Sequence, residues 1–380
     1  MAGPNVELDD VTAVEAVDRS EMLRAVASSA AQVRMAASAV AEVGLTVYDD
    51  LPRPRAIVCV GMGGSGIAGE VLSAVAGPGC PVPIWVHKNL GLPGWVGAND
   101  VVIAVSCSGS TQETLSAAVE AGRRGAMLFG VGAAPSPLAA VVDQARGVFV
   151  PAPTGRQPRA SLWSLTVPGL MLADRLGLLP ERLDLEAVAV RLESVAQACH
   201  VGRDSLVNPA KSLALRLEGD RVAQIWGCSP VTAAVAYRFA CQLNENAKMP
   251  AISGVLPEAA HNQIVAFDGG GAPGGARDVF ADPYDDATSA GLGRPELVQI
   301  LLREPGEESA PVARRADVAA QLAGERGLRI EQLVSEGATG LERLASLVCL
   351  VDFASVYAGI AAGYDPTPVS AITALKSGLD

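Results

Sequence analysis

The chain has few aromatic, histidine and lysine residues. Over 380 residues, aromatic side chains make up 4%, and there are only three histidines. Acidic residues outnumber lysine and arginine by 12, which disfavours nucleic acid or an anionic membrane surface as the main partner. An anionic small molecule is still compatible with this charge, because backbone dipoles act locally. Four of the 29 basic residues are lysines: Lys88, Lys211, Lys248 and Lys376.

Sequence signals for a metal site, a secreted protein or a membrane span are also missing. None of the seven cysteines forms a CxxC pair, and no cluster of His and Cys suggests metal ligands. Several cysteines lie in apolar runs, which favours reduced thiols and a cytoplasmic location. The first twenty residues carry acids before any apolar run, so no signal peptide is expected. The apolar run 344–362 contains Asp352 and small polar residues, which favours a buried core helix.

What is present predicts an α/β fold. Hydrophobic residues make up 49% of the chain, enough for two domains with cores of their own. Short apolar runs at 55–60, 83–87, 100–106 and 126–131 resemble strands that are buried on both faces. Apolar residues have helical spacing at 20–43, before the first run, and again from the end of the glycine-rich loop to about residue 76 and at 111–122. The last two of these predicted helices lie between the strands. This alternation predicts a doubly wound parallel sheet with flanking helices.

A second α/β unit is expected after a proline-rich linker at 151–159. Helical stretches at 161–178 and 184–200 lead to a strand at 221–227 and a helix from about 231 to 248. Residues 55–76 and 221–241 therefore look like two copies of one strand–turn–helix unit. We place the domains at 1–155 and 156–380. Strands near 297–303 and 329–334, a helix at 339–362 and a loop at 268–294 complete the prediction.

Two loops directly follow predicted strands. Residues 61–66 read GMGGSG, which suits an anion at a helix N-terminus, although a tight turn needed only for packing explains them equally well. The P-loop signature is absent, and although the glycines fit GxGxxG, no acidic residue follows about 20 positions later, as a dinucleotide site would require. Residues 106–111 place four hydroxyls on one turn around a glycine, and neutral donors in that arrangement suit a monophosphate. These hydroxyls belong to Ser106, Ser108, Ser110 and Thr111.

A carboxylate and an imidazole occur close together in the second half of the chain. Glu245 lies between two asparagines on one predicted helical turn, and His261 follows sixteen positions later. Such a pair can move protons on a polyhydroxy substrate. Taken singly, each residue has an ordinary interpretation: a solvated helix face for the glutamate, and a surface or capping role for the histidine.

The motifs together resemble the bifunctional phosphoglucose/phosphomannose isomerase family, whose members have two sugar isomerase (SIS) domains. The serine loop is typical of SIS domains in general. The order and spacing of the remaining motifs narrow the resemblance, which extends from about residue 55 to residue 376. These motifs are Gly63–Gly69, Pro158–Ala160, Gln242–Lys248, His261–Asn262 and Asp365–Val369 with Lys376.

The resemblance implies aldose–ketose isomerisation of a hexose 6-phosphate in a homodimer with shared active sites, without metal or cofactor. Glu245 resembles the base that moves a proton between C2 and C1. His261 looks like a ring-opening residue that reaches a neighbouring subunit's site, with Lys376 as its partner. Arg159 resembles the cation that stabilises the enediolate oxygen. The same resemblance assigns the phosphate loop to Ser106, Ser108 and Thr111, with Ser110 beside them, and the sugar pocket to Gly63, Gly64 and Ser65.

The chain departs from the family pattern at several positions. Cys107 and Ser110 stand where tyrosine and asparagine are often found, and Gln263 stands where glutamate is common. None of these departures removes a proposed catalytic group, but they leave substrate preference open. They also leave open a second function class, a non-catalytic phosphosugar sensor, which needs the phosphate loop and little else. No basic arm or DNA-binding helix pair is visible, so a transcription factor is not expected.

Overall fold

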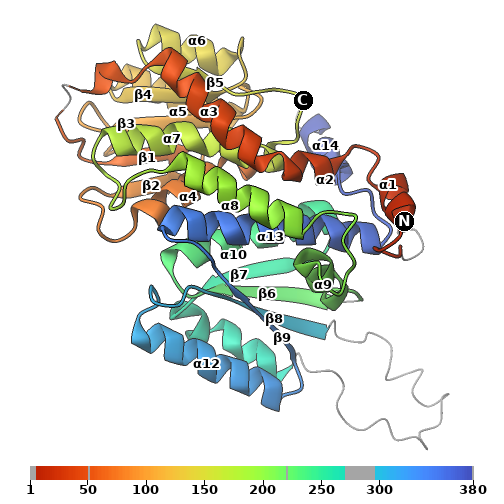
Figure 1. Ribbon diagram of the computed structural model, residues 1–380. Helices are drawn as coiled ribbons and strands as arrows, with labels where there is room; N and C mark the ends of the chain where they lie inside the picture. Colours follow the sequence, from red (N-terminus) through yellow and green to blue (C-terminus); the bar gives the residue numbers. More distant parts are fainter. Residues whose placement is uncertain (1–5, 50–51, 220, 270–295, 379–380) are drawn as a thin grey trace, which may run out of the picture. The chain divides into compact units, whose positions relative to one another are not determined.

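The computed structural model describes residues 6–49, 52–219, 221–269 and 296–378. The chain divides into two compact units whose segments alternate along the sequence. We call residues 21–197 with 337–349 the N-terminal unit. Residues 1–20, 198–336 and 350–380 make up the C-terminal unit. Each unit contains one parallel sheet with helices packed on it, as the sequence predicts (Figure 1).

The N-terminal unit is built on a five-stranded parallel sheet with the order β2-β1-β3-β4-β5. Every residue of β1 and β3 is buried, because helices cover both faces of the sheet. The first four strands match the predicted apolar runs, whereas β5 is not predicted from the sequence, and only its last residue, Pro151, falls in the predicted linker. The strands are β1 (Ile57–Val60), β2 (Ile84–His87), β3 (Val101–Ser106), β4 (Met127–Gly132) and β5 (Val148–Pro151).

Helices pack on both faces of this first sheet. On one face, alanines of α5 (Gln112–Arg123) and apolar residues of α6 (Pro137–Gln144) join the buried side chains of β1, β3 and β4. The other helices are α2 (Met22–Ala27), α3 (Ser29–Val43), α4 (Ile67–Ala76), α7 (Leu162–Arg175) and α8 (Leu185–Ala198). Short 3-10 turns are η1 (Thr46–Tyr48), η2 (Gly63–Ser65) and η3 (Pro158–Ala160).

The helix predicted over 20–43 is two helices, α2 and α3. They meet at Ser28, whose hydroxyl donates to the Ala25 carbonyl at 2.7 Å and so competes with the helical hydrogen-bond pattern.

Residues 156–197 belong to the N-terminal unit, which differs from the predicted boundary between 155 and 156. The Gln32 side-chain amide donates to the Ala160 carbonyl at 2.8 Å, and both groups are buried. Arg34 on the same helix forms ion pairs with Glu186 and Glu193 of α8. These contacts join α3 to η3 and α8. The proline-rich stretch that suggested a linker is therefore a surface loop inside one unit.

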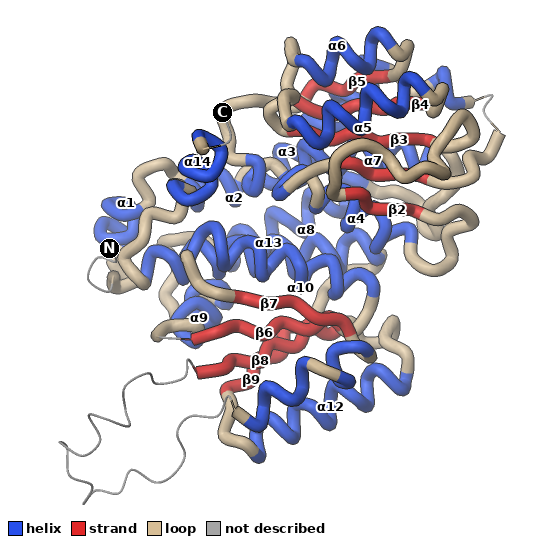
Figure 2. The backbone as a smooth tube through the Cα atoms, turned by 180° about the vertical axis from the view of Figure 1, so that it is seen from behind, coloured by secondary structure: helices blue, strands red, loops and turns tan. Residues whose placement is uncertain are grey.

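The C-terminal unit is built on a four-stranded parallel sheet with the order β7-β6-β8-β9, which repeats the order of the first four strands of the other sheet. Helices α10 and α12 cover opposite faces of it (Figure 2). The strands are β6 (Arg221–Gly227), β7 (Ala251–Val255), β8 (Glu296–Arg303) and β9 (Arg329–Val334). The helices are α1 (Val11–Val17), α9 (Pro209–Arg216), α10 (Pro230–Gln242), α12 (Ala310–Glu325) and α14 (Ser370–Ser377).

Three short helical turns complete the C-terminal unit. A π-helix, η4 (Leu243–Ala247), continues α10, and two 3-10 turns follow β7: η5 (Glu258–His261) and η6 (Gln263–Asp268). The predicted loop at 268–294 lies almost entirely outside the described residues.

The helix α13 (Gly340–Ala361) is continuous, with its first part in the N-terminal unit and its second part in the C-terminal unit. By length and composition alone it could cross a membrane, and its most apolar window spans 18 residues. Of that window, 94% is buried in the folded chain, in agreement with the predicted core helix.

Candidate functional site

The loop after β3 forms a compact turn lined by hydroxyl groups. The Ser106 hydroxyl donates to Thr111 Oγ1 at 2.9 Å, and the Ser110 hydroxyl donates to Ser108 Oγ at 3.1 Å. Ser106 is buried at the strand end, whereas Ser110 is exposed. Helix α5 begins directly after Thr111, so its N-terminal N–H groups lie at the same turn. Four hydroxyls and a helix N-terminus together suit the oxygens of a phosphate group.

Gly109 makes this turn possible. Its φ of +66° is a conformation that residues with a side chain rarely adopt. A Cβ atom at this position would also lie only 2.3 Å from the Ser136 side chain. Ser136 caps the N-terminus of α6, since its hydroxyl accepts from the Ala139 N–H at 3.2 Å. The Leu138 N–H donates to the Gly109 carbonyl at 2.9 Å and so joins α6 to the turn. The hydroxyl-lined turn therefore depends on glycine at position 109.

The glycine-rich loop after β1 lies beside the hydroxyl-lined turn. The Ser65 hydroxyl accepts a hydrogen bond from the Cys107 backbone N–H at 3.1 Å, which joins the two loops directly. Gly64 packs directly against the backbone of η3. A Cβ atom at this position would lie 2.8 Å from the Pro158 carbonyl carbon and 2.9 Å from the Arg159 backbone nitrogen. Gly63 has a φ of +51° and open space beside it.

The N-terminal unit thus brings together eight of the residues predicted from the sequence. Arg159 in η3 is buried, with 3% of its surface exposed. The carboxyl ends of β1 and β3 are the point where the strand order reverses, where open α/β sheets bind ligands. The residues are Gly63, Gly64, Ser65, Ser106, Ser108, Ser110, Thr111 and Arg159.

Cys107 adds a thiol to this turn. Burial raises the pKa of Cys107 above its ordinary value, partly offset by a hydrogen bond with Ser161. The thiol is therefore uncharged near neutral pH and does not repel a phosphate group. Tyrosine at this position would be far larger, so the cysteine leaves more room beside the hydroxyls.

Glu245 lies in the C-terminal unit on the π-helix η4, where the sequence predicts an ordinary helix through Lys248. Both sides of the turn are fixed. The buried Asn246 amide donates to the Ser355 hydroxyl at 2.9 Å, and the Asn244 side chain accepts from the Ala251 N–H at 3.2 Å. These bonds hold the π turn in place, and π turns are common at functional sites. Glu245 itself is half-buried.

A buried ion pair supports the helix that carries this turn. Arg238 donates two hydrogen bonds to Asp352 of α13, at 2.8 and 2.6 Å, and the Gln242 amide donates to the same carboxylate at 2.9 Å. Arg238 is 1% exposed and Asp352 is 3% exposed. The three side chains hold the end of α10 against α13, one turn before Glu245.

His261 and Lys376 lie on two further elements of the C-terminal unit. His261 is exposed at the end of η5, and Lys376 is exposed on α14. Gln263, which departs from the family pattern, has a structural role. Its side-chain oxygen accepts from the Trp226 indole N–H at 2.7 Å, and its side-chain nitrogen donates to the Ser253 carbonyl at 3.1 Å. A glutamate could keep the first bond but not the second.

The carboxyl edge of the second sheet has no counterpart of the hydroxyl-lined turn among the described residues. The first residue after β8 is Glu304, which is 2% exposed and accepts a hydrogen bond from the Ser229 hydroxyl. Its backbone N–H donates to the Glu308 carboxylate at 2.6 Å. Two carboxylates therefore lie where the first sheet presents serines, and they would repel a phosphate group.

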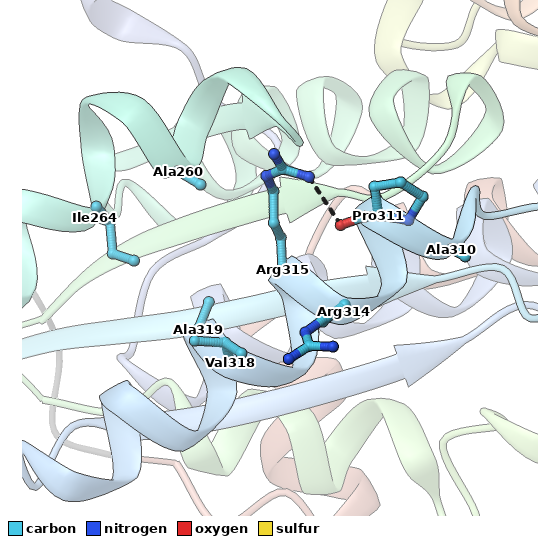
Figure 3. Close-up of a pocket in the computed structure, with 8 residues that line it drawn as sticks. All are labelled: Ala260, Ile264, Ala310, Pro311, Arg314, Arg315, Val318 and Ala319. Atoms are coloured by element: carbon cyan, nitrogen blue, oxygen red, sulfur yellow. Dashed lines mark hydrogen bonds between the residues drawn. The ribbon is translucent and has the colours of Figure 1, made fainter.

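An apolar groove of about 610 Å³ lies between η5–η6 and α12 (Figure 3). Ala260 and Ile264 line one side, and Arg315 on the other side donates to the Pro311 carbonyl at 3.0 Å. None of the residues predicted from the sequence lines this groove. Within the part of the chain that the structure describes, no group of three His, Cys, Asp or Glu side chains is placed to hold a metal ion.

Comparisons with known proteins identify the class and then the family. Similar solved structures include a hypothetical protein from Thermus thermophilus, with a TM-score of 0.69 and 14% identity, covering 100% of this chain and 99% of that one. The C-terminal domain of glucosamine-fructose-6-phosphate aminotransferase from Francisella tularensis gives a TM-score of 0.66 at 13% identity, covering 91% and 98%. At these identities the comparisons establish the fold alone, an α/β arrangement of two parallel sheets with flanking helices.

Sequence relatives then define the family. Residues 206–379 match the family described as bacterial phospho-glucose isomerase C-terminal SIS domain. The bifunctional phosphoglucose/phosphomannose isomerase of Caldicellulosiruptor bescii is 31% identical over 85% of this chain and 89% of its own length. The enzyme of the same name from Aquifex aeolicus is 30% identical, over 88% and 93%. The chain belongs to the bifunctional phosphoglucose/phosphomannose isomerase family, as its motifs predict.

Proposed function

We propose that this protein is a sugar-phosphate isomerase that interconverts fructose 6-phosphate with glucose 6-phosphate, mannose 6-phosphate or both. Membership of the family supports the reaction class. The observation that carries the proposal is the turn after β3, where four hydroxyls and the start of α5 converge around Gly109. This turn suits a phosphate monoester, and the substrate class follows from it.

In the proposed reaction the hydroxyl-lined turn holds the 6-phosphate, with Gly63, Gly64 and Ser65 beside the sugar. His261 of a second subunit and Lys376 assist opening of the sugar ring. Glu245 then removes the proton from C2 of the open-chain aldose, and the electron pair moves toward O1 to give a cis-enediolate. Return of that proton to C1, with proton transfer from O2 to O1, gives the ketose.

Arg159 has the role of stabilising the enediolate. A permanent guanidinium charge suits an oxygen that becomes negative only during the reaction. Its burial strengthens this effect, because the interaction with a developing charge is less screened by water. The mechanism needs no metal or cofactor. It also requires a homodimer with shared sites, and we place the protein in the cytoplasm.

The test is incubation of the purified protein with fructose 6-phosphate, followed by separate coupled assays for glucose 6-phosphate and mannose 6-phosphate. Turnover in either channel is expected, and it should persist after treatment with EDTA. Turnover in neither channel, together with protection of the protein against heat by the phosphosugar, would contradict the enzyme proposal. That result would favour the alternative, a phosphosugar sensor, with which the departures at Cys107 and Ser110 are compatible.

A further inference from the structure

Lys248 connects the turn that carries Glu245 to a distant segment of the C-terminal unit. Its ammonium group donates to the Glu245 backbone carbonyl at 2.6 Å and to the Pro366 backbone carbonyl at 3.2 Å. The two acceptors, on Glu245 and Pro366, are 121 residues apart in the sequence. One side chain therefore joins the end of the π-helix η4 to the turn that precedes α14.

The backbone at Lys248 shows that this contact has a conformational cost. Lys248 has a φ of +56°, in the left-handed region that residues other than glycine and asparagine rarely adopt. Backbone strain of this kind persists where surrounding contacts offset it. The left-handed conformation ends η4 and directs the side chain back to the last carbonyl groups of the helix, which lack helical partners.

The other end of the connection is the turn before α14. The Thr367 N–H donates to the Asp365 carboxylate at 2.9 Å, which closes this turn around Pro366. Helix α14, with Lys376 in its last turn, begins at Ser370 and has no buried residue. Because packing contributes little to holding α14, the position of this helix depends on the turn that precedes it.

We propose that Lys248 is a positioning residue for the isomerase reaction. It fixes the main chain at Glu245 and, through Pro366, the turn from which α14 and Lys376 extend. The inference rests on the proposed function, since it assigns Glu245 and Lys376 to one reaction. Lys248 does not contact the substrate in this role; it sets the distance between the proton-transfer carboxylate and the ring-opening lysine.

Three substitutions at position 248 distinguish the effect of the ammonium group from the effect of the left-handed backbone conformation. Lys248→Met removes both hydrogen bonds and keeps the aliphatic length. Lys248→Asn also removes the ammonium group, but asparagine tolerates the left-handed conformation. Lys248→Arg retains a cation that can donate to two carbonyls. A matched control is Arg315→Met, which also removes a bond from a cation to a main-chain carbonyl, at an exposed position of α12 outside the predicted site.

For the Met and Asn variants we expect kcat to fall by about 10- to 100-fold, the size expected when a catalytic group is misplaced by about 1 Å. The KM for fructose 6-phosphate should be unchanged, because the phosphate-binding turn belongs to the other unit. Lys248→Arg should recover most of kcat, and Arg315→Met should match the wild type. Thermal melts identify any variant that fails to fold, and the inference then depends on the remaining two.

Amide hydrogen exchange over residues 362–378 provides a readout that does not depend on activity. Faster exchange in Lys248→Met and Lys248→Asn, but not in Lys248→Arg or Arg315→Met, supports the connection. If the wild type shows no turnover but exchange changes in this way, the proposed function fails while the connection through Lys248 stands. Unchanged exchange, unchanged kcat, or a change in KM alone would overturn the positioning role.

Discussion

The side-chain amide of Asn246 donates a hydrogen bond to the Ser355 hydroxyl at 2.9 Å, and this bond ties the π-helix beside Glu245 to α13. Asn246 is fully buried, and Gly359 leaves room for its main chain, since a Cβ atom there would lie 2.5 Å from the Asn246 carbonyl oxygen. The neighbour of the proposed base is thus fixed through both side chain and backbone. Glu245 is held on a turn that cannot easily relax into a regular α-helix.

The role of Glu245 predicts a loss of turnover without a loss of binding. Glu245→Gln keeps the shape of the side chain but cannot accept the C2 proton, so kcat should fall by about 10²- to 10⁴-fold. Heat protection by fructose 6-phosphate should persist, because the phosphate loop is intact. Glu325→Gln, at the end of α12, is the matched control and should retain full turnover. Unchanged turnover in Glu245→Gln would remove this residue from its proposed role.

The geometry at Gly109 predicts that alanine there disrupts phosphate binding. The added Cβ atom would need a strained φ and would overlap the Ser136 side chain, so the hydroxyl-lined turn must rearrange. We expect at least a roughly tenfold weaker apparent affinity for fructose 6-phosphate, measured by isothermal titration calorimetry. Gly79→Ala in the same unit is the control, because its Cβ atom would meet nothing within 4 Å. Equal affinities in the two variants would show that the turn is not the phosphate site.

The buried pair Arg238–Asp352 predicts a large loss of stability when one partner is removed. Arg238→Met leaves the Asp352 carboxylate buried without its cation, which should lower the free energy of unfolding by about 3 to 5 kcal/mol. Replacing both residues, as Arg238→Met with Asp352→Leu, should recover much of that loss. Urea denaturation of the wild type, the single variant and the double variant measures the free energy of unfolding of each. If the double variant is no more stable than Arg238→Met, the buried, uncompensated charge of Asp352 is not the cause of the loss.

Asp9 provides a prediction about pH. Hydrogen bonding, chiefly from the Ser205 hydroxyl, with the Lys211 ammonium also contributing, lowers the pKa of Asp9 below its usual value of 3.8. A depressed pKa stabilises the folded state above about pH 4, and that contribution is lost as the pH falls through the folded-state pKa. Asp9→Asn should therefore cost about 1 kcal/mol or less at pH 7 and progressively less below pH 4. A difference in melting temperature that is constant from pH 7 to pH 3 would contradict this assignment.

The parts of the fold that the sequence predicts are those whose signal lies within a short window. The buried strands β1 and β3 are short runs of mainly β-branched apolar residues, and β4, β6 and β8 are mostly apolar. The sequence predicts all five within a few positions. Helix α12 was not expected, because it packs on the sheet through Ala316, Ala319 and Ala323, which are too small to form a clear apolar stripe. Strand β7 was not expected either, because Gly254 lacks a side chain and interrupts the apolar pattern that predicts a strand.

The candidate site also has one part that short stretches of sequence predict and one part that they do not. The hydroxyls of the β3–α5 turn are neighbours in sequence, so their convergence around Gly109 follows from local patterns. The contacts that fix Glu245 are of another kind, since Ser355 and Pro366 lie more than a hundred positions away along the chain. No spacing rule links residues so far apart. Their proximity depends on how the sheet and α13 fold.

The course of α13 has a consequence for how the protein is synthesised. The N-terminal unit includes residues 337–349, and the C-terminal unit includes both the first twenty residues and the last thirty-one. Neither unit is complete until synthesis has passed residue 349, although the first sheet has been translated by residue 151. A ribosome that stalls after the first sheet therefore holds a unit that lacks α7, α8 and residues 337–349. Both units therefore receive their share of one late helix, α13, before they are complete.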